Sequence, residues 1–216
     1  RPNNQHATFI LAPWQSGEVM QSWIIKQVPK KYDAYSISPK ALLLKDPVAT
    51  SKQCLEVCEQ ALEKVLSLSK KYSSLNIVGL SVGTGIAAYV ANRPITTKLN
   101  SVDLICPGAE LSTALWLGSR TKKLKRQYQQ QGFSLQKIQK LWSKVDLINN
   151  LDFAKNIPLR ITYSESDFVI IPEQTKKVIA KLKPSEIKNL KVRKNRFFGH
   201  YLTMFWVWLN WRTIYR

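Results

Sequence analysis

SSLNIVGLSVGTGIAAYVANR, residues Ser73–Arg93, joins an apolar run to a run of small, helix-forming residues through a glycine-rich turn. It holds three of the chain's 8 glycines, Gly79, Gly83 and Gly85, and the turn carries one serine, Ser81. Such a pattern predicts a buried strand, a sharp turn and a helix. The turn needs the backbone freedom that glycine provides.

The rest of the chain alternates in the same way, which predicts an α/β fold with a mostly parallel central sheet flanked by helices. Charged residues on the last strand indicate that it lies at a sheet edge. We expect strands at residues 6–14, 32–39, 75–80, 101–107, 158–163 and 190–194, and helices at 50–72, 85–93, 172–182 and 200–212.

The alternation of strands and helices lapses over residues 107–156, which have the pattern of two or three helices. This segment is too long for a plain connection between a strand and the next. We therefore expect a single domain over residues 1–216, with residues 107–156 inserted as a helical cap or lid. The chain opens at Arg1, which leaves a removed leader open.

The chain is strongly basic, with 33 Lys and Arg against 14 Asp and Glu and a net charge of +19. Such a field attracts polyanions, whether an anionic membrane surface, an acidic carrier or nucleic acid. The charge is dispersed apart from one dense run, Ser119–Gln127, and no nucleic-acid-binding motif accompanies it. Specific recognition of nucleic acid is therefore disfavoured against a solvated or membrane-seeking surface.

The three cysteines, Cys54, Cys58 and Cys106, do not form a disulfide framework. Cys54 and Cys58 lie four residues apart without a matching pair of His or Cys, so we expect no metal site. Buried free thiols indicate a reducing, cytoplasmic compartment, with peripheral attachment to a membrane left open. No apolar run reaches the roughly 18 residues that a membrane-spanning helix needs.

Three interpretations of the glycine-rich turn compete. A phosphate-binding loop is excluded because no Gly-Lys-Ser/Thr follows. Gly83, Gly85 and Ala88 match the dinucleotide pattern G-x-G-x-x-A, but two strands precede it, and the nearby acid, Asp103, is on the following strand. The third interpretation is the motif G-x-S-x-G, in which a strained turn between strand and helix exposes a nucleophilic serine, Ser81. This one accounts for every part of the turn.

A serine hydroxyl needs a base within hydrogen-bond reach. Of the 2 histidines, His6 begins the first strand, roughly 20 Å from the turn, whereas His200 follows the last strand at the carboxyl edge of the sheet. Asp167 follows a strand at the same edge and is the expected carboxylate, with Glu165 as the alternative.

At these three places the sequence resembles the α/β-hydrolase superfamily of serine esterases, lipases and thioesterases. The resemblance rests on GLSVG, PLRITYSESDFVIIP and FFGHY, and it extends over residues 7–216. It implies the α/β-hydrolase fold and a catalytic triad of Ser81, Asp167 and His200, in the chain order that this family uses, with no cofactor or metal.

The same resemblance implies an oxyanion hole made of two backbone amides. The first is the N–H of Val82, at the start of a helix. The second comes from the loop APWQSG, which has Ala12 and Pro13 where many family members carry His-Gly. Proline has no N–H, so Trp14 is the expected donor and Gln15 the next.

The expected activity is hydrolysis of an acyl ester or thioester through an acyl-enzyme, acting on a small-molecule acyl substrate. Residues that could contact the substrate are Leu80, Leu115, Trp116 and Trp142. The apolar residues of the cap equally fit a role in seating its helices. The basic run Lys122–Arg126 could attract an acidic head group or carrier.

The final segment, FFGHYLTMFWVWLNWRTIYR, is rich in aromatic residues and arginine. This composition suits a membrane interface, but a terminal helix that buries one face on the sheet is the favoured interpretation. The competing function is a catalytically silent binding protein with a hydrolase-like scaffold, attracted to anionic partners. A nucleic-acid-binding role ranks third, and the sequence does not indicate an oligomeric state.

Overall fold

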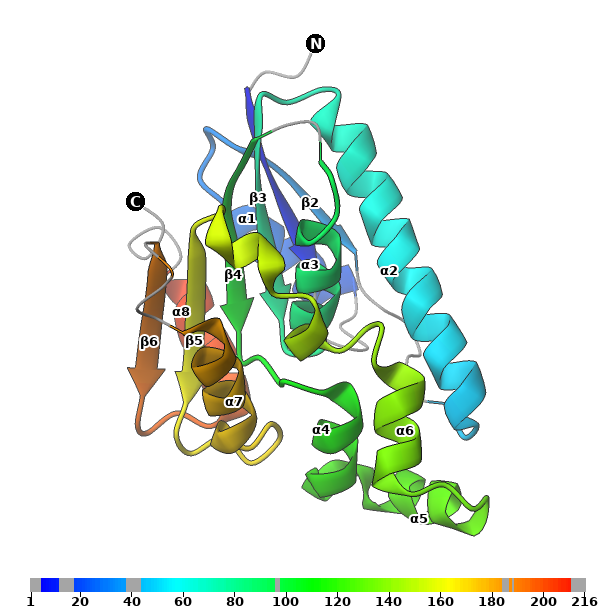
Figure 1. Cartoon of the computed structure of the whole chain (residues 1–216). Helices are drawn as coiled ribbons and strands as arrows, with labels where there is room; N and C mark the ends of the chain where they lie inside the picture. The colour runs from blue at the N-terminus through cyan, green and yellow to red at the C-terminus, as the bar shows by residue number, and fades with distance from the viewer. Residues whose placement is uncertain are drawn as a thin grey trace.

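The centre of the protein is a sheet of six parallel strands, ordered β2-β1-β3-β4-β5-β6 (Figure 1). The structure is a computed structural model that describes residues 5–11, 18–37, 44–95, 98–183, 187 and 189–210. The strands are β1 (His6–Leu11), β2 (Asp33–Ile37), β3 (Ser74–Leu80), β4 (Lys98–Ile105), β5 (Leu159–Ser164) and β6 (Leu190–Asn195). The predicted fold class is confirmed, and β6 lies at a sheet edge as its charges indicated.

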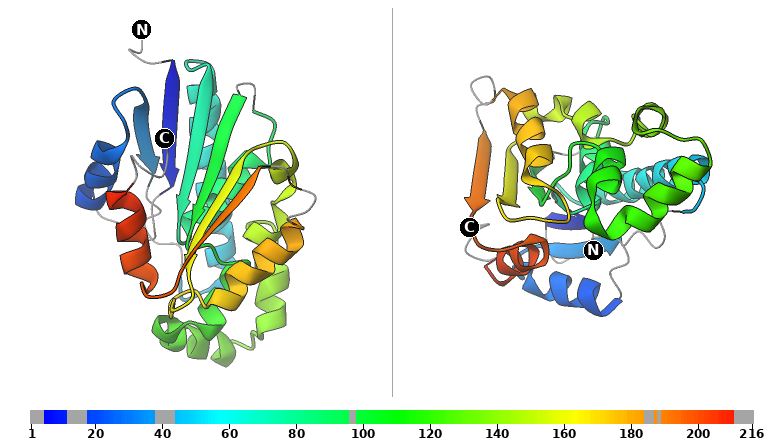
Figure 2. Two further views of the ribbon diagram at one scale, coloured as in Figure 1. Left: turned by 90° about the vertical axis from the view of Figure 1, so that its left-hand side faces the viewer. Right: turned by 90° about the horizontal axis from the view of Figure 1, so that it is seen from below.

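Helices cover both faces of the sheet. On one face lie α2 (Pro47–Ser69), α3 (Gly83–Ala91) and α7 (Pro172–Leu182), and on the other α1 (Glu18–Gln27) and α8 (His200–Leu209) lie side by side (Figure 2). None of the helices in the described part of the chain combines the length and the apolar character needed to cross a membrane.

Apolar residues at helical spacing hold α2 against the sheet. Cys54, Cys58, Ala61, Val65 and Leu68 are buried at steps of three and four residues, so one face of this helix enters the main core. The helix begins three residues earlier than predicted because the Asp46 side chain accepts a hydrogen bond from the Val48 amide and Pro47 occupies the first turn. It ends at Ser69, three residues before the predicted end.

Residues 107–156 form three short helices, α4 (Leu111–Leu117), α5 (Lys122–Gln130) and α6 (Leu135–Trp142), and three 3₁₀ segments. The 3₁₀ segments are η1 (Ser119–Thr121), η2 (Leu147–Asn149) and η3 (Asp152–Lys155). The helices α4, α5 and α6 lie beyond the carboxyl ends of the strands (Figure 1). The segment therefore lies where a cap over this edge would be.

The strand register brings three distant parts of the chain to one edge. Gly79 pairs with Leu11 near the end of β3, and Ser164 pairs with Asn195 at the ends of β5 and β6. Because all strands run parallel, the turns that follow β3, β5 and β6 emerge at the same edge of the sheet. This is how Ser81, Asp167 and His200 come together.

A polar cluster is buried on the sheet face that α1 and α8 cover. Arg160 Nη2 donates to Asp103 Oδ2 at 2.8 Å and to Ser101 Oγ at 2.9 Å, and Arg160 Nε also donates to Asp103. Ser101 Oγ in turn donates to Asn76 Oδ1 at 3.2 Å. We call Arg160, Asp103 and Ser101 the Arg160 cluster.

The structure corrects three expectations about the elements. The helix α1 was not predicted, because residues 18–27 lack a clear apolar period. Asp103 lies in the interior of β4, which starts at Lys98 and not at residue 101. The last helix ends at Leu209, one residue before the last described position, and residues 211–216 lie outside the described residues.

Candidate active site

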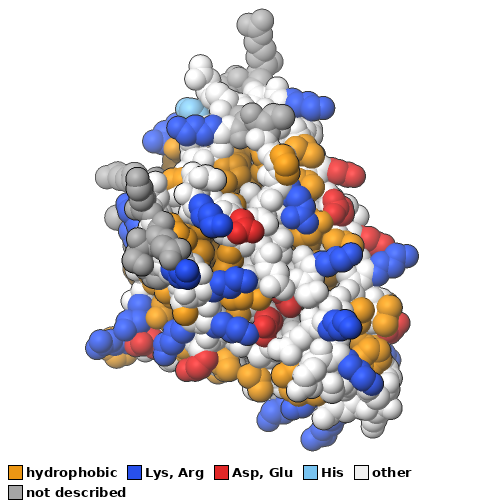
Figure 3. Space-filling view, in the orientation of Figure 1, with side chains coloured by type: hydrophobic (Ala, Val, Ile, Leu, Met, Phe, Trp, Pro, Cys, Tyr) orange, Lys and Arg blue, Asp and Glu red, His pale blue; other side chains and the backbone are white. Residues whose placement is uncertain are grey.

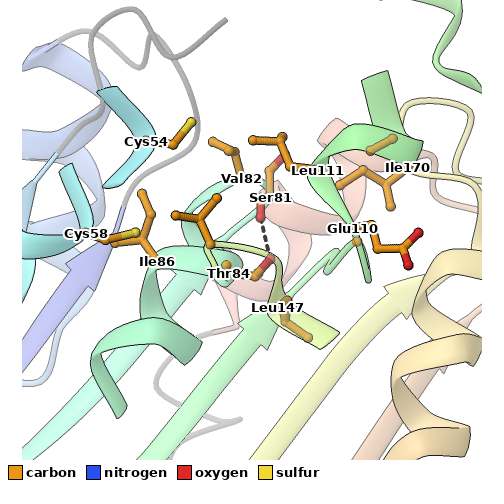
Figure 4. A pocket seen from close by; sticks show the side chains of 14 residues that line it. Cys54, Cys58, Ser81, Val82, Thr84, Ile86, Glu110, Leu111, Leu147 and Ile170 are labelled. Atoms are coloured by element: carbon orange, nitrogen blue, oxygen red, sulfur yellow. Dashed lines mark hydrogen bonds between the residues drawn. The ribbon is translucent and has the colours of Figure 1, made fainter. Parts of the chain in front are cut away.

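Ser81 occupies a strained turn between β3 and α3. Its φ is 53°, a left-handed conformation that non-glycine residues rarely adopt. Its carbonyl accepts hydrogen bonds from the amide and the hydroxyl of Thr84, the latter at 2.6 Å (Figure 4). A Cβ atom on Gly79 would lie 2.6 Å from the carbonyl oxygen of Gly83, so the turn is this tight only because residue 79 is glycine. The strained backbone conformation is therefore that of Ser81, the residue of this turn whose hydroxyl contacts His200.

His200 connects the Ser81 hydroxyl to a buried carboxylate. Its Nε2 lies 2.9 Å from Ser81 Oγ, and its Nδ1 lies 2.7 Å from Asp167 Oδ2. The other oxygen of Asp167 accepts from the amides of Val169 and Ile170, both at 2.9 Å. With Nδ1–H donated to the carboxylate, Nε2 presents its lone pair to the serine. We call Ser81, His200 and Asp167 the Ser81 cluster.

The two alternative partners lie elsewhere. His6 bonds through Nδ1 to Ser74 Oγ at 2.6 Å, at the start of β3 and so at the opposite end of the strand from Ser81. Glu165 forms ion pairs with Lys194 at 3.2 Å and with Arg196 at 3.8 Å. The structure brings neither residue to the serine.

The Val82 amide is one candidate donor for an oxyanion. It directly follows Ser81 and caps the N-terminus of α3, where the helix dipole favours negative charge. No hydrogen-bond acceptor for this N–H is found in the described part of the chain. Trp14 and Gln15, the expected sources of the second donor, lie outside the described residues.

Cys106, Asp167 and His200 could in principle offer ligands to a metal, since one donor atom of each lies within 4.8 Å of the others. The distance of 2.7 Å between His200 Nδ1 and Asp167 Oδ2 fits a shared proton. Two ligands of a tetrahedral zinc ion are about 3.3 Å apart. The present geometry therefore suits a proton better than a metal.

An apolar cavity opens beside Ser81 and encloses about 490 Å³, counting its mouth. Figure 4 shows Val82 and Leu111 next to the serine and Cys54 and Cys58 on the α2 side. Six of its 14 lining residues come from the 107–156 segment, so this segment forms one wall. The lining residues are Cys54, Cys58, Ser81, Val82, Thr84, Gly85, Ile86, Gly108, Glu110, Leu111, Ala114, Val145, Leu147 and Ile170.

The four residues expected to contact a substrate are not among those that line this cavity. Leu80 faces α8 in the smaller core, and Leu115 is buried in the main core. Trp142 is buried and donates its indole N–H to the carbonyl of Pro47 at 2.9 Å. Trp116 is half-buried beside Lys125, whose ammonium lies 5.3 Å from the ring centre. For Leu115, Trp116 and Trp142, the interpretation that they seat the helices of the 107–156 segment fits their contacts.

The carboxyl groups of Glu110 and Asp146 lie beside the cavity, and both are bonded to groups other than Ser81. The Glu110 side chain turns toward α7 (Figure 4), where it pairs with Lys177 at 2.7 Å. That bond and others lower the pKa of Glu110 against the opposing effect of burial. Asp146 is buried and accepts from the Leu111 amide at 2.9 Å. Burial raises the pKa of Asp146 to about 7.

Solved structures with the same architecture are α/β-hydrolases. Esterase B from Lactobacillus rhamnosis matches with a TM-score of 0.68 at 13% identity, over 99% of this chain and 75% of its own. Acyl-protein thioesterase 2 from Zea mays matches with a TM-score of 0.56 at 15% identity, over 99% of this chain and 96% of its own. The protein has the α/β-hydrolase fold.

The match to a puromycin-hydrolysing peptidase from Mycobacterium tuberculosis has a TM-score of 0.63 at 11% identity and covers 91% of this chain. This chain spans about a third of that peptidase, 31% of its length. No family model matches the sequence, and no curated protein matches it. At these identities the likeness establishes the fold alone.

Proposed function

We propose that the protein is a serine hydrolase that cleaves an acyl ester or thioester through an acyl-enzyme. The observation that carries the proposal is the continuous hydrogen-bonded chain from Ser81 Oγ through His200 to Asp167, with Ser81 in a left-handed turn. A serine held in this way has the base that it needs and the base has its orienting carboxylate. The fold and the esterase and thioesterase neighbours support a hydrolase.

In the first half-reaction, Ser81 Oγ forms a bond to the substrate carbonyl carbon while its proton passes to His200 Nε2. Asp167 stabilises the imidazolium that results. The tetrahedral intermediate then collapses, the bond to the leaving alcohol or thiol breaks, and His200 returns the proton to that group. In the second half-reaction, His200 takes a proton from water as the water oxygen bonds to the acyl carbon. The bond between that carbon and Ser81 Oγ then breaks, the acid leaves, and His200 returns the proton to Ser81 Oγ.

The oxyanion of each intermediate accepts a hydrogen bond from the Val82 amide, and we assign the second donor to the loop that contains Trp14. The acyl chain enters the cavity beside Ser81. Its walls of Leu111, Leu147 and Ile86 suit an apolar acyl chain, because they offer hydrophobic contact and few polar partners. The neutral thiols of Cys54 and Cys58 continue this lining, since burial raises the pKa of Cys54 to about 12 and that of Cys58 as well.

A panel of p-nitrophenyl esters of increasing acyl length, measured beside the matching thioesters, tests the proposal. We expect turnover by the wild type and none above background by Ser81→Ala. Ala114→Phe narrows the cavity and is expected to lower kcat/KM for long chains by about tenfold while acetate is spared. If a folded wild type hydrolyses no ester or thioester in the panel, the protein is better regarded as a silent binding protein.

A further inference from the structure

The outer side of α8 exposes large apolar side chains along its whole length. Leu202 is 59% exposed, Phe205 47% and Leu209 57%, whereas Thr203 and Val207 on the inner side are buried. A helix that is apolar on all sides normally lies in a core or a membrane. In α8, the apolar side chains on the outer side of the helix are exposed.

The exposed residues continue onto neighbouring elements. Trp23 of α1 stacks on Phe205 with ring centres 5.5 Å apart, and the ring of Phe198 lies 6.4 Å from that of Trp206. Phe197, which precedes α8, is 88% exposed. Of eleven large hydrophobic side chains exposed in the described part of the chain, six form this patch, and Phe168 and Phe197 border it. We call the six the α8 surface: Trp23, Phe198, Tyr201, Leu202, Phe205 and Leu209.

Cations flank the α8 surface on the β6 side. Asn195 points toward α8, because its side-chain amide donates to Thr203 at 2.8 Å. Side chains alternate along a strand, so Lys191 and Arg193 share the face of Asn195. The sequence from Leu190 to Arg216 contains six Lys or Arg residues and no Asp or Glu. The face that carries α2 differs, because acidic and basic side chains are interspersed there (Figure 3).

We propose that the α8 surface docks on an anionic lipid bilayer. Aromatic and leucine side chains insert at the boundary between head groups and acyl chains, while Lys191 and Arg193 meet the lipid phosphates. The charge decides between a bilayer and a second copy of the chain. A dimer through this face would bring two chains of +19 together, whereas an anionic surface attracts each of them.

The position of this surface gives the docking a consequence for the candidate site. His200 is the first residue of α8, and Phe168, which borders the α8 surface, directly follows Asp167. One end of the α8 surface is therefore adjacent to the Ser81 cluster. This consequence rests on the proposed function: docking through α8 would bring His200, at the start of that helix, and with it the Ser81 cluster near the lipid, and would favour an acyl substrate dissolved there. The docking itself does not depend on catalysis, so Ser81→Ala is expected to bind vesicles as the wild type does.

Co-sedimentation with phosphatidylcholine vesicles, with and without phosphatidylserine, tests the proposal on the full chain. We expect binding to the vesicles that contain phosphatidylserine, weakened by salt. The variant Leu202→Ser/Phe205→Ser/Leu209→Ser is expected to lower the affinity by at least about tenfold. The control Val48→Ser/Leu117→Ser removes exposed apolar side chains elsewhere and should bind normally.

Two double variants that each remove two positive charges distinguish direct contact with lipid phosphates from the attraction of the whole basic protein to an anionic surface. Lys191→Gln/Arg193→Gln should weaken binding more than Lys52→Gln/Lys155→Gln, which removes two exposed cations from other parts of the molecule. Equal weakening by both pairs, or full binding by the triple serine variant, would overturn the proposal. So would a wild type that ignores the vesicles and forms a dimer that the triple variant abolishes, since the face would then be a protein interface.

Discussion

The Ser81 cluster and the Arg160 cluster are both largely buried polar groups on one sheet, and both contain a serine and an aspartate. In the Arg160 cluster the guanidinium bonds both the carboxylate and the hydroxyl of Ser101, and all the backbone lies in regular strands. In the Ser81 cluster the serine is in a left-handed turn, its partner is a titratable imidazole, and an apolar cavity opens beside it. The residue types are similar but the geometry differs, and under the proposed function only the Ser81 cluster is reactive.

Replacing the two serines is the sharpest way to break this comparison. Ser81→Ala should lower kcat on an activated ester by roughly 10⁴-fold or more, because the nucleophile is gone. Ser101→Ala should leave kcat unchanged and affect only thermal stability, since Ser101 bonds to Arg160 and not to any reacting group. Steady-state kinetics of the two variants, at equal concentrations of folded protein checked by circular dichroism, measure this difference. An equal loss of kcat in both variants would contradict the distinction between the two clusters.

The aspartates give the next largest contrast. Asp167→Asn keeps the shape of the side chain but removes the charge that stabilises the imidazolium, so kcat should fall by about 10²- to 10⁴-fold. Asp103→Asn changes the matching carboxylate of the Arg160 cluster and should leave kcat within about twofold of the wild type. Comparable losses in kcat from both would show that the two clusters are not functionally distinct.

Asp146 is a third buried aspartate, and it lacks the arginine or histidine partner of the other two. Glu110 and Lys177 are the charged groups that act on it, and burial still raises its pKa to about 7. The folded chain therefore holds a proton that the unfolded chain releases near pH 4, so this residue lowers stability as the pH rises from about 4 to about 7.

Asp146→Asn cannot ionise and can still accept the Leu111 amide. Its unfolding free energy, minus that of the wild type, should increase by roughly 3 kcal/mol between about pH 4 and about pH 7. Urea unfolding at several pH values measures this difference. A difference that stays constant with pH would mean that Asp146 titrates normally.

The smallest effect is expected from Arg160. Arg160→Met removes the hydrogen-bonding cation from the buried Asp103 carboxylate, and because Arg160 is itself partly exposed this should cost about 2 kcal/mol of stability. The Ser81 cluster is untouched, so kcat at a temperature well below unfolding should not change. Thermal unfolding and the ester assay on the same sample separate the two roles, and an unaltered melting temperature would argue against a structural role for this ion pair.

Much of the fold followed from local patterns in the sequence. The central strands are short runs rich in apolar or β-branched residues, and the charges of β6 marked it as an edge strand. The carboxyl-edge position of Asp167 and His200 followed from the strands that precede them. The motif from Gly79 to Gly83 indicated Ser81 as the candidate nucleophile, because few other structures need glycine at both ends of so short a turn. The helix α1 was missed because residues 18–27 lack a clear apolar period, and the stacking of Trp23 on Phe205 of α8 joins residues that are far apart in the sequence.

The cavity could not be predicted from the sequence in the same way. Leu111 and Leu115 lie four residues apart on α4, and yet the first lines the cavity and the second enters the core. Which one faces the serine depends on how α4 is rotated, and Asp146 and Gln174 fix that rotation by bonding the amides of Leu111 and Glu110. Trp142 looked like a substrate contact but satisfies its indole N–H against Pro47. These contacts are tertiary, and no local pattern encodes them.

Covalent labelling tests the reactivity of Ser81 without any assumption about the substrate. We expect intact-mass spectrometry to find one fluorophosphonate adduct on the wild type, with peptide mapping to Ser81, and no adduct on Ser81→Ala. A folded wild type that stays unmodified, or a Ser81→Ala variant that is labelled equally, would contradict the account.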